Sequence, residues 1–309
     1  ITGCFNVGTS FEININPEPV AFTILDVEFC DDALDGDDSN GIIQNIDLSS
    51  EDTSVLGTNQ DANDFVVSYH LTLSDANDGD NPLVDFENNS NPQIIYVRVF
   101  NKKTGTTNTR TSFNLIVNPL PVFSVATPSY YCIKEPAVTI SVKNPQEVYT
   151  YEWTNDAGDV LGTATSLDVT KGANYHVTAT KTDGTLCSKT QTITVIDSDL
   201  ATLEEQDISI IDDSENNSIT IINENQNLGI GNYEFAILDQ NGFNVRAFQD
   251  DPHFDQLEGG LYQIAIRDKN GCGQITKEFS ILMFPRFFSP NNDGKNDVWD
   301  IRGLTGFYK

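Results

Sequence analysis

The chain alternates apolar and polar residues over short runs, a pattern that is typical of β-strands with one buried face. Ten such runs stand at 65–73, 94–100, 112–117, 137–142, 149–154, 175–181, 190–196, 233–239, 262–268 and 277–282. Turn sequences such as NDAGD, TDGT and DKNG separate them, and no helical apolar period lasts more than two turns. We therefore predict an all-β protein built from tandem immunoglobulin-like antiparallel sandwiches.

An internal repeat sets the module boundaries. Residues 2–20 align with residues 104–122 at a constant shift of 102 residues. Solenoid repeats have periods of roughly 20–50 residues, so this longer period indicates whole domains in tandem. Each copy ends on N-P-x-P-V, whose prolines hold a short linker extended. We predict the end of a preceding repeat at 1–17, sandwiches at 18–119, 120–197 and 198–284, and the start of another domain at 285–309.

The charge balance narrows the choice of partners. The chain has 17 Lys and Arg against 46 Asp and Glu, a formal net charge of −29. Such a field repels nucleic acid and anionic lipid, so we expect neither as a partner. No run of apolar residues is long enough to cross a membrane, so we expect no direct membrane insertion. The opening ITGCFNVGTSFEININ lacks the pattern of a secretory leader, and we expect a piece of a larger protein.

Catalytic patterns are absent from the sequence. The histidines His70, His176 and His253 fall in different predicted modules, and none is part of an H-E-x-x-H motif. Because His70 and His176 lie within strand patterns, we expect both side chains to face solvent. G-x-S-x-G and G-x-x-x-x-G-K-[ST] do not occur. We therefore expect no enzyme activity.

Five cysteines are too few to hold a chain of this length together by number. Cys132 stands at the start of its module, and Cys187 lies just before the last predicted strand. The first and last strands of a sandwich approach each other, so we predict a Cys132–Cys187 disulfide, with two buried thiols as the alternative. The 102-residue shift brings Cys30 onto Cys132, yet its own module lacks the corresponding partner. We predict that Cys4, Cys30 and Cys272 are unpaired, and the disulfide favours oxidising, extracellular surroundings.

A calcium site is the only cofactor hypothesis. Calcium takes six to eight oxygen ligands around a tight turn, and the stretch from Ser289 to Asp300 has EF-type spacing with glycine at position 6. The candidate ligands are Ser289, Asn291, Asp293, Asp297 and Asp300. Two of these depart from the usual first and last residues, so Asx turns are the alternative. Asp35 and Asp37 form a weaker candidate, and a third acidic loop spans 74–81.

Two resemblances cover most of the chain. Residues 120–284 resemble the immunoglobulin-like, polycystic-kidney-disease-like modules of large bacterial surface proteins. They share a core tryptophan, Trp153, with a G-x-Y before a strand and an x-G-C after it. Residues 26–122 contain F-C-D-D, N-P-Q-I-I-Y-V-R-V and S-F-N-L-I-V-N-P-L-P-V, and resemble a repeat of large flavobacterial adhesins.

The stretch FFSPNNDGKNDVWDI resembles the opening of the gliding-motility-associated C-terminal domain. This domain is the type B sorting signal of the type IX secretion system of Bacteroidota. The matching positions are Phe288, Pro290, Asn291, Asp293, Gly294, Asn296, Asp297, Trp299 and Ile301. Ser289 stands where threonine is usual, and Asn292 where glycine is common. A complete sorting domain has more strands after Trp299, so we expect 285–309 to be incomplete.

These resemblances imply a surface protein similar to the SprB-like large adhesins. They imply export by the type IX secretion translocon and attachment through a SprF-like outer-membrane barrel protein. A surface glycan or another adhesion target would then be the ligand. We predict a non-enzymatic adhesin stalk at the cell surface, acting in attachment or gliding motility. The alternatives are a calcium-dependent glycan-binding module and an accessory region of a secreted hydrolase.

Overall fold

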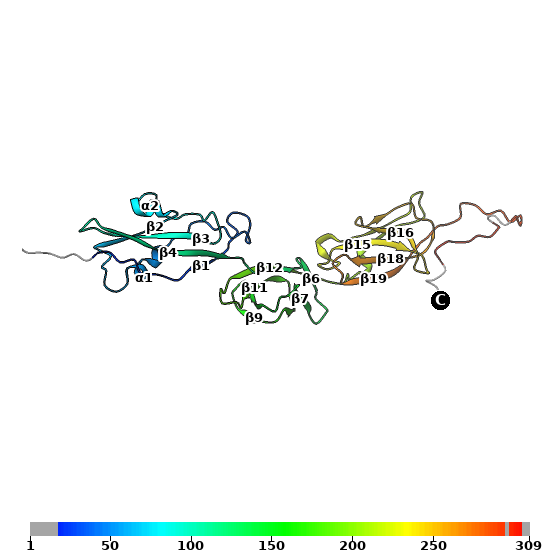
Figure 1. Cartoon of the computed structure of the whole chain (residues 1–309). Coiled ribbons are helices and arrows are strands. Elements are labelled where there is room, and N and C mark those ends of the chain that lie inside the picture. Colours follow the sequence, from blue (N-terminus) through cyan, green and yellow to red (C-terminus); the bar gives the residue numbers. More distant parts are fainter. Residues whose placement is uncertain (1–17, 294–296, 305–309) are drawn as a thin grey trace, which may run out of the picture. The chain divides into compact units, whose positions relative to one another are not determined.

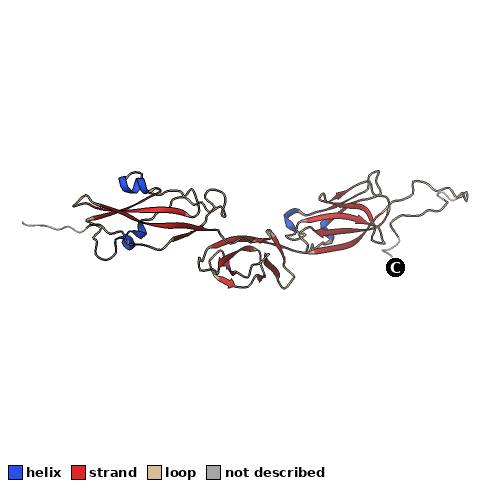
Figure 2. Ribbon diagram, viewed as in Figure 1, coloured by secondary structure: helices blue, strands red, loops and turns tan. Residues whose placement is uncertain are grey.

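The computed structural model describes residues 18–293 and 297–304 (Figures 1 and 2). The fold is mostly β, as the alternating pattern predicts, and every one of the ten predicted runs contains a strand. The run at 65–73 ends early: its strand stops at His70, and Leu73 already begins a helix. The other strands of the described chain are mostly short, and their sequences hold too few alternating positions to be recognised.

The first module has one four-stranded sheet in the order β1-β4-β3-β2. Its strands are β1 (Val27–Cys30), β2 (Phe65–His70), β3 (Gln93–Asn101) and β4 (Thr107–Asn118), and its helices are η1 (Ser49–Glu51), α1 (Asp52–Leu56) and α2 (Leu73–Asp78). Strand β1 runs parallel to β4, whereas the other pairs are antiparallel. Alternate residues of β3 and β4, including Val97 and Leu115, are fully buried.

A second sheet, which a sandwich requires, is not found among the described residues of this module. Residues of the 43–56 segment, including Ile46, Val55 and Leu56, cover the sheet instead. This segment pairs only through an isolated bridge between Ile46 and Phe86. The preceding stretch is rich in Asp, Gly, Ser and Asn, which favour turns over strands. The sandwich predicted for 18–119 is therefore replaced by a sheet covered with loops and short helices.

The acidic stretch at 74–81, expected to be a loop, begins as helix α2 (Figure 1). The Thr72 hydroxyl accepts a hydrogen bond from the Asp75 amide at 3.1 Å, which caps the first turn. Gly79 ends the helix with a φ of 77°, a left-handed conformation that glycine adopts without strain. The helix-capping Thr72 and the helix-ending Gly79 therefore favour a helix here, although the composition of the stretch is typical of a loop.

The middle module is a two-sheet sandwich. One sheet has the order β10-β7-β5 and the other β6-β12-β11-β8-β9. The strands are β5 (Ser124–Val125), β6 (Ser129–Cys132), β7 (Val138–Lys143), β8 (Tyr149–Asn155), β9 (Val160–Gly162), β10 (Ser166–Val169), β11 (Ala173–Lys181) and β12 (Ser188–Ser198). Trp153 on β8 is fully buried, and its indole Nε1 donates to the Ala164 carbonyl at 2.8 Å. The prediction of a core tryptophan is confirmed.

The third module is also a two-sheet sandwich, with the orders β13-β14-β17 and β16-β15-β18-β19. Its elements are η2 (Glu205–Asp207), β13 (Ile208–Ile211), β14 (Ser218–Ile221), η3 (Glu224–Gln226), β15 (Tyr233–Leu238), β16 (Asn244–Gln249), β17 (His253–Phe254), β18 (Gly260–Asp268) and β19 (Gly273–Ile281). Apolar residues of both sheets, such as Ile219 and Ile264, form its core. Beyond β19, the backbones of Met283 and Arg302 form an isolated bridge that closes the segment between them into a loop.

The chain divides into two compact units whose limits differ from the predicted module boundaries. Unit 1 comprises the residues up to Val122 together with Glu147–Thr150 and Ala179–Lys189. Unit 2 comprises Phe123–Gln146, Tyr151–Thr178 and the residues from Thr190 onward. The middle sandwich thus contributes residues to both units. One disulfide lies within each unit.

Two disulfide junctions form the candidate functional site

In unit 1, a disulfide joins Cys30 to Cys187, with their Cα atoms 5.4 Å apart. Cys30 is the last residue of the four-residue strand β1 and lies opposite Asn118, the last residue of β4. Cys187 directly precedes the first residue of β12. The bond therefore connects the end of the first module's sheet to a hairpin of the middle module.

Polar contacts surround this junction. The backbone amide of Asp31 donates to the Asn118 carbonyl at 2.8 Å, which extends the pairing of β1 and β4 by one hydrogen bond. The Lys189 ammonium forms an ion pair with Asp38, so a charged pair lies close to Cys187 in the sequence. Cys187 is only 1% exposed, whereas Cys30 is exposed.

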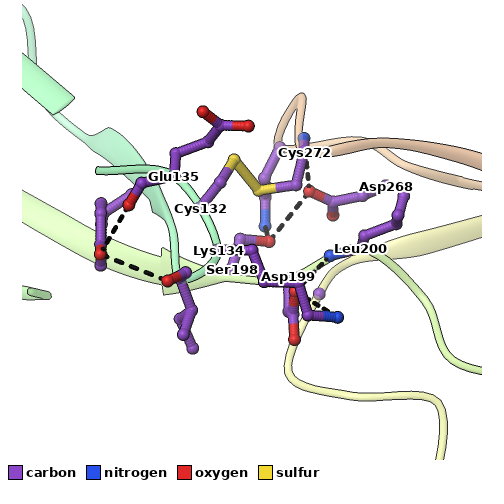
Figure 3. The surroundings of a disulfide bond; sticks show 12 residues. Cys132, Lys134, Glu135, Ser198, Asp199, Leu200, Asp268 and Cys272 are labelled. Carbon is purple, nitrogen blue, oxygen red and sulfur yellow. Dashed lines mark hydrogen bonds and ion pairs between the residues drawn. A yellow bond between two sulfur atoms is a disulfide. The ribbon is translucent and has the colours of Figure 1, made fainter. Parts of the chain in front are cut away.

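In unit 2, a second disulfide joins Cys132 to Cys272, again with the Cα atoms 5.4 Å apart (Figure 3). Cys132 is the last residue of β6 and lies opposite Ser198, the last residue of β12. Cys272 directly precedes the first residue of β19. This bond therefore connects the middle module to the third.

A buried carboxylate organises the second junction. Asp268 is 3% exposed, and its Oδ2 accepts hydrogen bonds from the Ser198 hydroxyl at 2.9 Å and from the Cys272 amide at 3.0 Å (Figure 3). Its Oδ1 accepts from the Asn232 amide at 2.9 Å. Three donors offset the cost of burying this group. Asp268 therefore ties the end of β12 to the residue that carries the disulfide in the third module.

The two junctions follow one rule. In each, one cysteine ends a four-residue strand that runs parallel to the last strand of its own module. The second cysteine directly precedes the last strand of the next module. The residue after the first cysteine also repeats its contact, since the Ile133 amide donates to the Ser198 carbonyl at 3.0 Å as Asp31 does to Asn118.

The predicted Cys132–Cys187 disulfide is wrong, and the direction of the strands explains why. The first and last strands of the middle module do pair, but in parallel, so Cys132 lies beside the far end of β12. From Cys187 to Ser198 is 198 − 187 = 11 residues, or about 36 Å of strand. A disulfide needs Cα atoms within roughly 7 Å. The prediction that Cys30 and Cys272 are unpaired is wrong as well, and Cys4 lies outside the described residues.

The sequence did contain a signal for the correct pairing. The 102-residue shift places Cys30 on Cys132, which marks these two as equivalent cysteines. Cys187 and Cys272 are equivalent too, because each stands a few residues before the last predicted strand of its module. Joining the first kind to the second kind in the following module gives both observed bonds. The incorrect prediction pairs cysteines within one module.

The histidines occupy three different environments. His70 is fully buried, which contradicts the expected solvent-facing side chain: its Nδ1 lies 2.7 Å from the Asp80 carbonyl and its Nε2 2.9 Å from the Ser68 hydroxyl. Burial lowers the pKa of His70. His176 is partly buried and contacts Asp156 at 2.8 Å, whereas His253 is exposed on β17. Each ring has at least one hydrogen-bond partner among the described residues.

The candidate calcium ligands make hydrogen bonds to one another and to the backbone. Asp297 Oδ1 accepts from the amides of Asn291 and Asn292 at 3.0 and 2.6 Å, and Asn291 donates to Asp293 at 2.9 Å. These are the Asx-type contacts of the alternative interpretation. Ser289 belongs to the described range 18–293 and Asp300 to the described range 297–304, whereas Gly294 and Asn296 lie outside the described residues.

The weaker candidate has the same character. Asp35 accepts hydrogen bonds from the Asp37 amide at 2.9 Å and from the Asn40 side chain at 2.6 Å. The Asn40 contact lowers the pKa of Asp35. In the described part of the chain, no three His, Cys, Asp or Glu side chains gather in a group that could hold a metal ion. Calcium binding therefore stays a prediction.

The sorting-motif aromatics meet in the loop that the Met283–Arg302 bridge closes. The rings of Phe288 and Trp299 pack edge to face, with centroids 5.9 Å apart and planes at 87°. Both rings remain about half exposed, at 52% and 54%. Pairs of this geometry contribute roughly 0.5–1.5 kcal/mol beyond their buried area. The loop therefore presents a local aromatic pair instead of burying it in a core.

The fold and the two junctions define a class: tandem β domains, two of them two-sheet sandwiches, joined by inter-domain disulfides. Within that class, residues 26–121 match the model of the Flavobacterium inter-domain disulphide bond domain. This region contains Cys30, the first cysteine of the unit 1 junction. The match covers most of the first module and does not extend to the two that follow.

Comparison with solved structures gives tandem β-domain proteins at low similarity. Domains A168–A170 of titin are 12% identical, with a TM-score of 0.35, covering 70% of this chain and 88% of that one. Three N-terminal domains of the bacteriophage RB49 Hoc protein are 10% identical, with a TM-score of 0.34 and coverages of 73% and 88%. The FN1–FN3 domains of chicken CNTN1 are 12% identical, with a TM-score of 0.30 and coverages of 70% and 90%. No curated protein matches the chain.

One further observation bears on where the protein works. Disulfides between domains persist in oxidising surroundings, which indicates an extracytoplasmic location. Within 18–293 and 297–304, no helix is both long enough and apolar enough to traverse a bilayer.

Proposed function

We propose that this chain is part of the stalk of a non-enzymatic cell-surface adhesin. The observation that carries the proposal is the pair of junctions, in which consecutive modules are joined by a linker and by a disulfide. A second covalent connection suits modules that transmit force outside the cell. The match to a flavobacterial inter-domain disulphide bond domain supports a Bacteroidota origin.

The C-terminal segment supplies the proposed route to the surface. The resemblance of residues 287–301 to a type B sorting signal supports export by the type IX secretion translocon and retention by a SprF-like outer-membrane barrel protein. Because Phe288 and Trp299 form an exposed pair, they are available for recognition by such a partner. The adhesive target would then be a surface glycan or another cell-surface molecule.

The test is surface display of the whole protein in its own cell. We expect the double change Phe288→Ala and Trp299→Ala to abolish antibody labelling of intact cells while the protein accumulates inside. Phe287→Ala is the matched control, because Phe287 is 63% exposed in the same loop but is not among the motif positions. Normal display of the double variant would overturn the proposed route.

A calcium-dependent glycan-binding module is the second candidate. One observation favours it: the half-exposed Phe288 and Trp299 rings lie in the same loop as the proposed ligand Asp297. Sugar rings stack on exposed aromatics, and calcium can coordinate sugar hydroxyls. We expect calcium to raise the melting temperature of the protein if it binds, and a chelator to reverse the shift. The control is Asp297→Asn, which should not respond to calcium. If calcium leaves the melting curve of the unaltered protein unchanged, the metal has no part in this hypothesis.

A further inference from the structure

The two disulfides close loops that overlap in the sequence. The first loop runs from Cys30 to Cys187 and the second from Cys132 to Cys272, so the stretch from Cys132 to Cys187 belongs to both. Separate loops would each shorten their own stretch of chain. Overlapping loops instead create a shorter covalent route that uses both bonds at once.

We propose that the interlaced disulfides form a covalent load path that limits how far the chain extends under tension. The inference rests on the proposed stalk function. The path runs from Cys30 across to Cys187, backward through the middle module to Cys132, and across to Cys272. This route contains 187 − 132 = 55 residues, whereas the backbone between Cys30 and Cys272 contains 272 − 30 = 242.

The folded middle module lies along this path, and its strands β6 and β12 are oriented so that they resist being pulled apart by tension. Force enters at Cys187, next to the first residue of β12, and leaves at Cys132, which lies opposite the last residue, Ser198. Strands β6 and β12 run parallel, so tension pulls them lengthwise past each other. The hydrogen bonds between two strands loaded in this way share the force. If the strands were instead peeled apart from one end, their hydrogen bonds would break one at a time.

The unit 2 junction also keeps its two covalent connections together. The backbone leaves β12 at Ser198, and the disulfide leaves β6 at Cys132, directly beside it. Asp268 binds the Ser198 hydroxyl and the Cys272 amide through one carboxylate oxygen (Figure 3). The linker and the disulfide are therefore anchored at the same place, and load arriving at the junction divides between them.

Single-molecule stretching of the full chain from its two ends tests the proposal. The forms to compare are the oxidised protein, the Cys30→Ser/Cys187→Ser variant, the Cys132→Ser/Cys272→Ser variant, and the reduced protein. With only the first bond, the route between Cys30 and Cys272 has 272 − 187 = 85 residues; with only the second it has 132 − 30 = 102. At about 3.5 Å per residue, the stretched length between residues 30 and 272 is about 190 Å in the oxidised protein and about 850 Å in the reduced protein. It is about 360 Å in the Cys30→Ser/Cys187→Ser variant and about 300 Å in the Cys132→Ser/Cys272→Ser variant.

The order of these lengths decides the outcome. The oxidised protein must be the shortest, about 110 Å below the shorter single-bond form, because the 55-residue route from Cys187 back to Cys132 exists only when both bonds are present. An oxidised length equal to that of either serine variant would overturn the load path. Reduction of the unaltered protein serves as the second measurement, since it needs no variant to fold. Surface display does not depend on these lengths, so failure of the stalk function and failure of the load path are distinguishable.

Discussion

The Ser198 hydroxyl donates to the Asp268 carboxylate at 2.9 Å across the junction between the middle and third modules. The same carboxylate oxygen accepts from the Cys272 amide, so one buried charge contacts both the exit strand and the disulfide. We expect Asp268→Ala to leave these donors unsatisfied and to lower the free energy of unfolding by about 3 kcal/mol. Urea denaturation under oxidising conditions measures the change.

The matched control for this change is Asp250→Ala. Asp250 pairs with Lys269 at 2.7 Å, but its side chain is 77% exposed. Exposed pairs contribute little, so we expect a change of about 0.5 kcal/mol or less. Equal effects of the two substitutions would show that Asp268 has no special part in the junction.

The disulfide pairing can be checked directly by peptide mapping without reduction. We expect one cross-linked peptide pair that contains Cys30 and Cys187 and another that contains Cys132 and Cys272. The physical reason is distance: parallel pairing of β6 with β12 keeps Cys132 away from Cys187. Mass spectrometry of the digest identifies the pairs. A peptide joining Cys132 to Cys187 would contradict the structure.

The buried His70 predicts a pH dependence for unit 1. Burial lowers the pKa of His70, and the Arg98 charge acts in the same direction. The unfolded chain therefore binds a proton more readily than the folded one, so stability is full above the unfolded pKa of about 6.5 and falls as the pH drops toward the folded pKa. We expect melting temperatures measured between pH 7 and pH 5 to show this loss.

Replacing His70 by Gln removes the titrating group and should flatten the pH dependence in this window. The control is His253→Gln, because His253 is exposed on β17 and its ring forms a hydrogen bond with the Thr220 hydroxyl at the surface. We expect that control to retain the loss of stability of the unaltered protein. A His70→Gln variant with an unaltered pH profile would assign the loss to other groups.

Trp153 gives a prediction for the core of the middle module. Trp153→Phe removes the hydrogen bond to the Ala164 carbonyl and leaves a cavity beside β8, so we expect a loss of about 2–4 kcal/mol. Trp299→Phe changes an exposed ring in the same way and should cost about 0.5 kcal/mol or less. Thermal unfolding monitored by circular dichroism measures both. Similar losses would mean that Trp153 is less well packed than its burial indicates.

The sequence predicted long strands well and junctions poorly, for physical reasons. Strands such as β3 and β11 alternate buried and less buried residues over most of their length, so their pattern is recognisable in the sequence. The solvent-facing prediction for His70 is wrong because the chain returns after helix α2 and places the Asp80 carbonyl beside the ring. No local sequence pattern predicts this contact between His70 and Asp80, which are ten residues apart.

The disulfides illustrate a different limit. Periodicity reports which side of a strand is buried, but it does not report whether two paired strands run parallel or antiparallel. The parallel pairing of β6 with β12 decides which end of β12 lies next to Cys132. Only the comparison of equivalent cysteines in successive modules could have supplied this information, because it relies on repetition instead of strand direction.

The placement of the cysteines also encodes the order of the modules. The first module offers only the cysteine of the strand end, Cys30, and the third only the cysteine before a last strand, Cys272, whereas the middle module has both kinds. Exchanging the first and third modules would leave thiols with no complementary neighbour. The described modules are therefore not interchangeable. The two kinds of cysteine allow both disulfides to form only when the modules follow one another in the observed order.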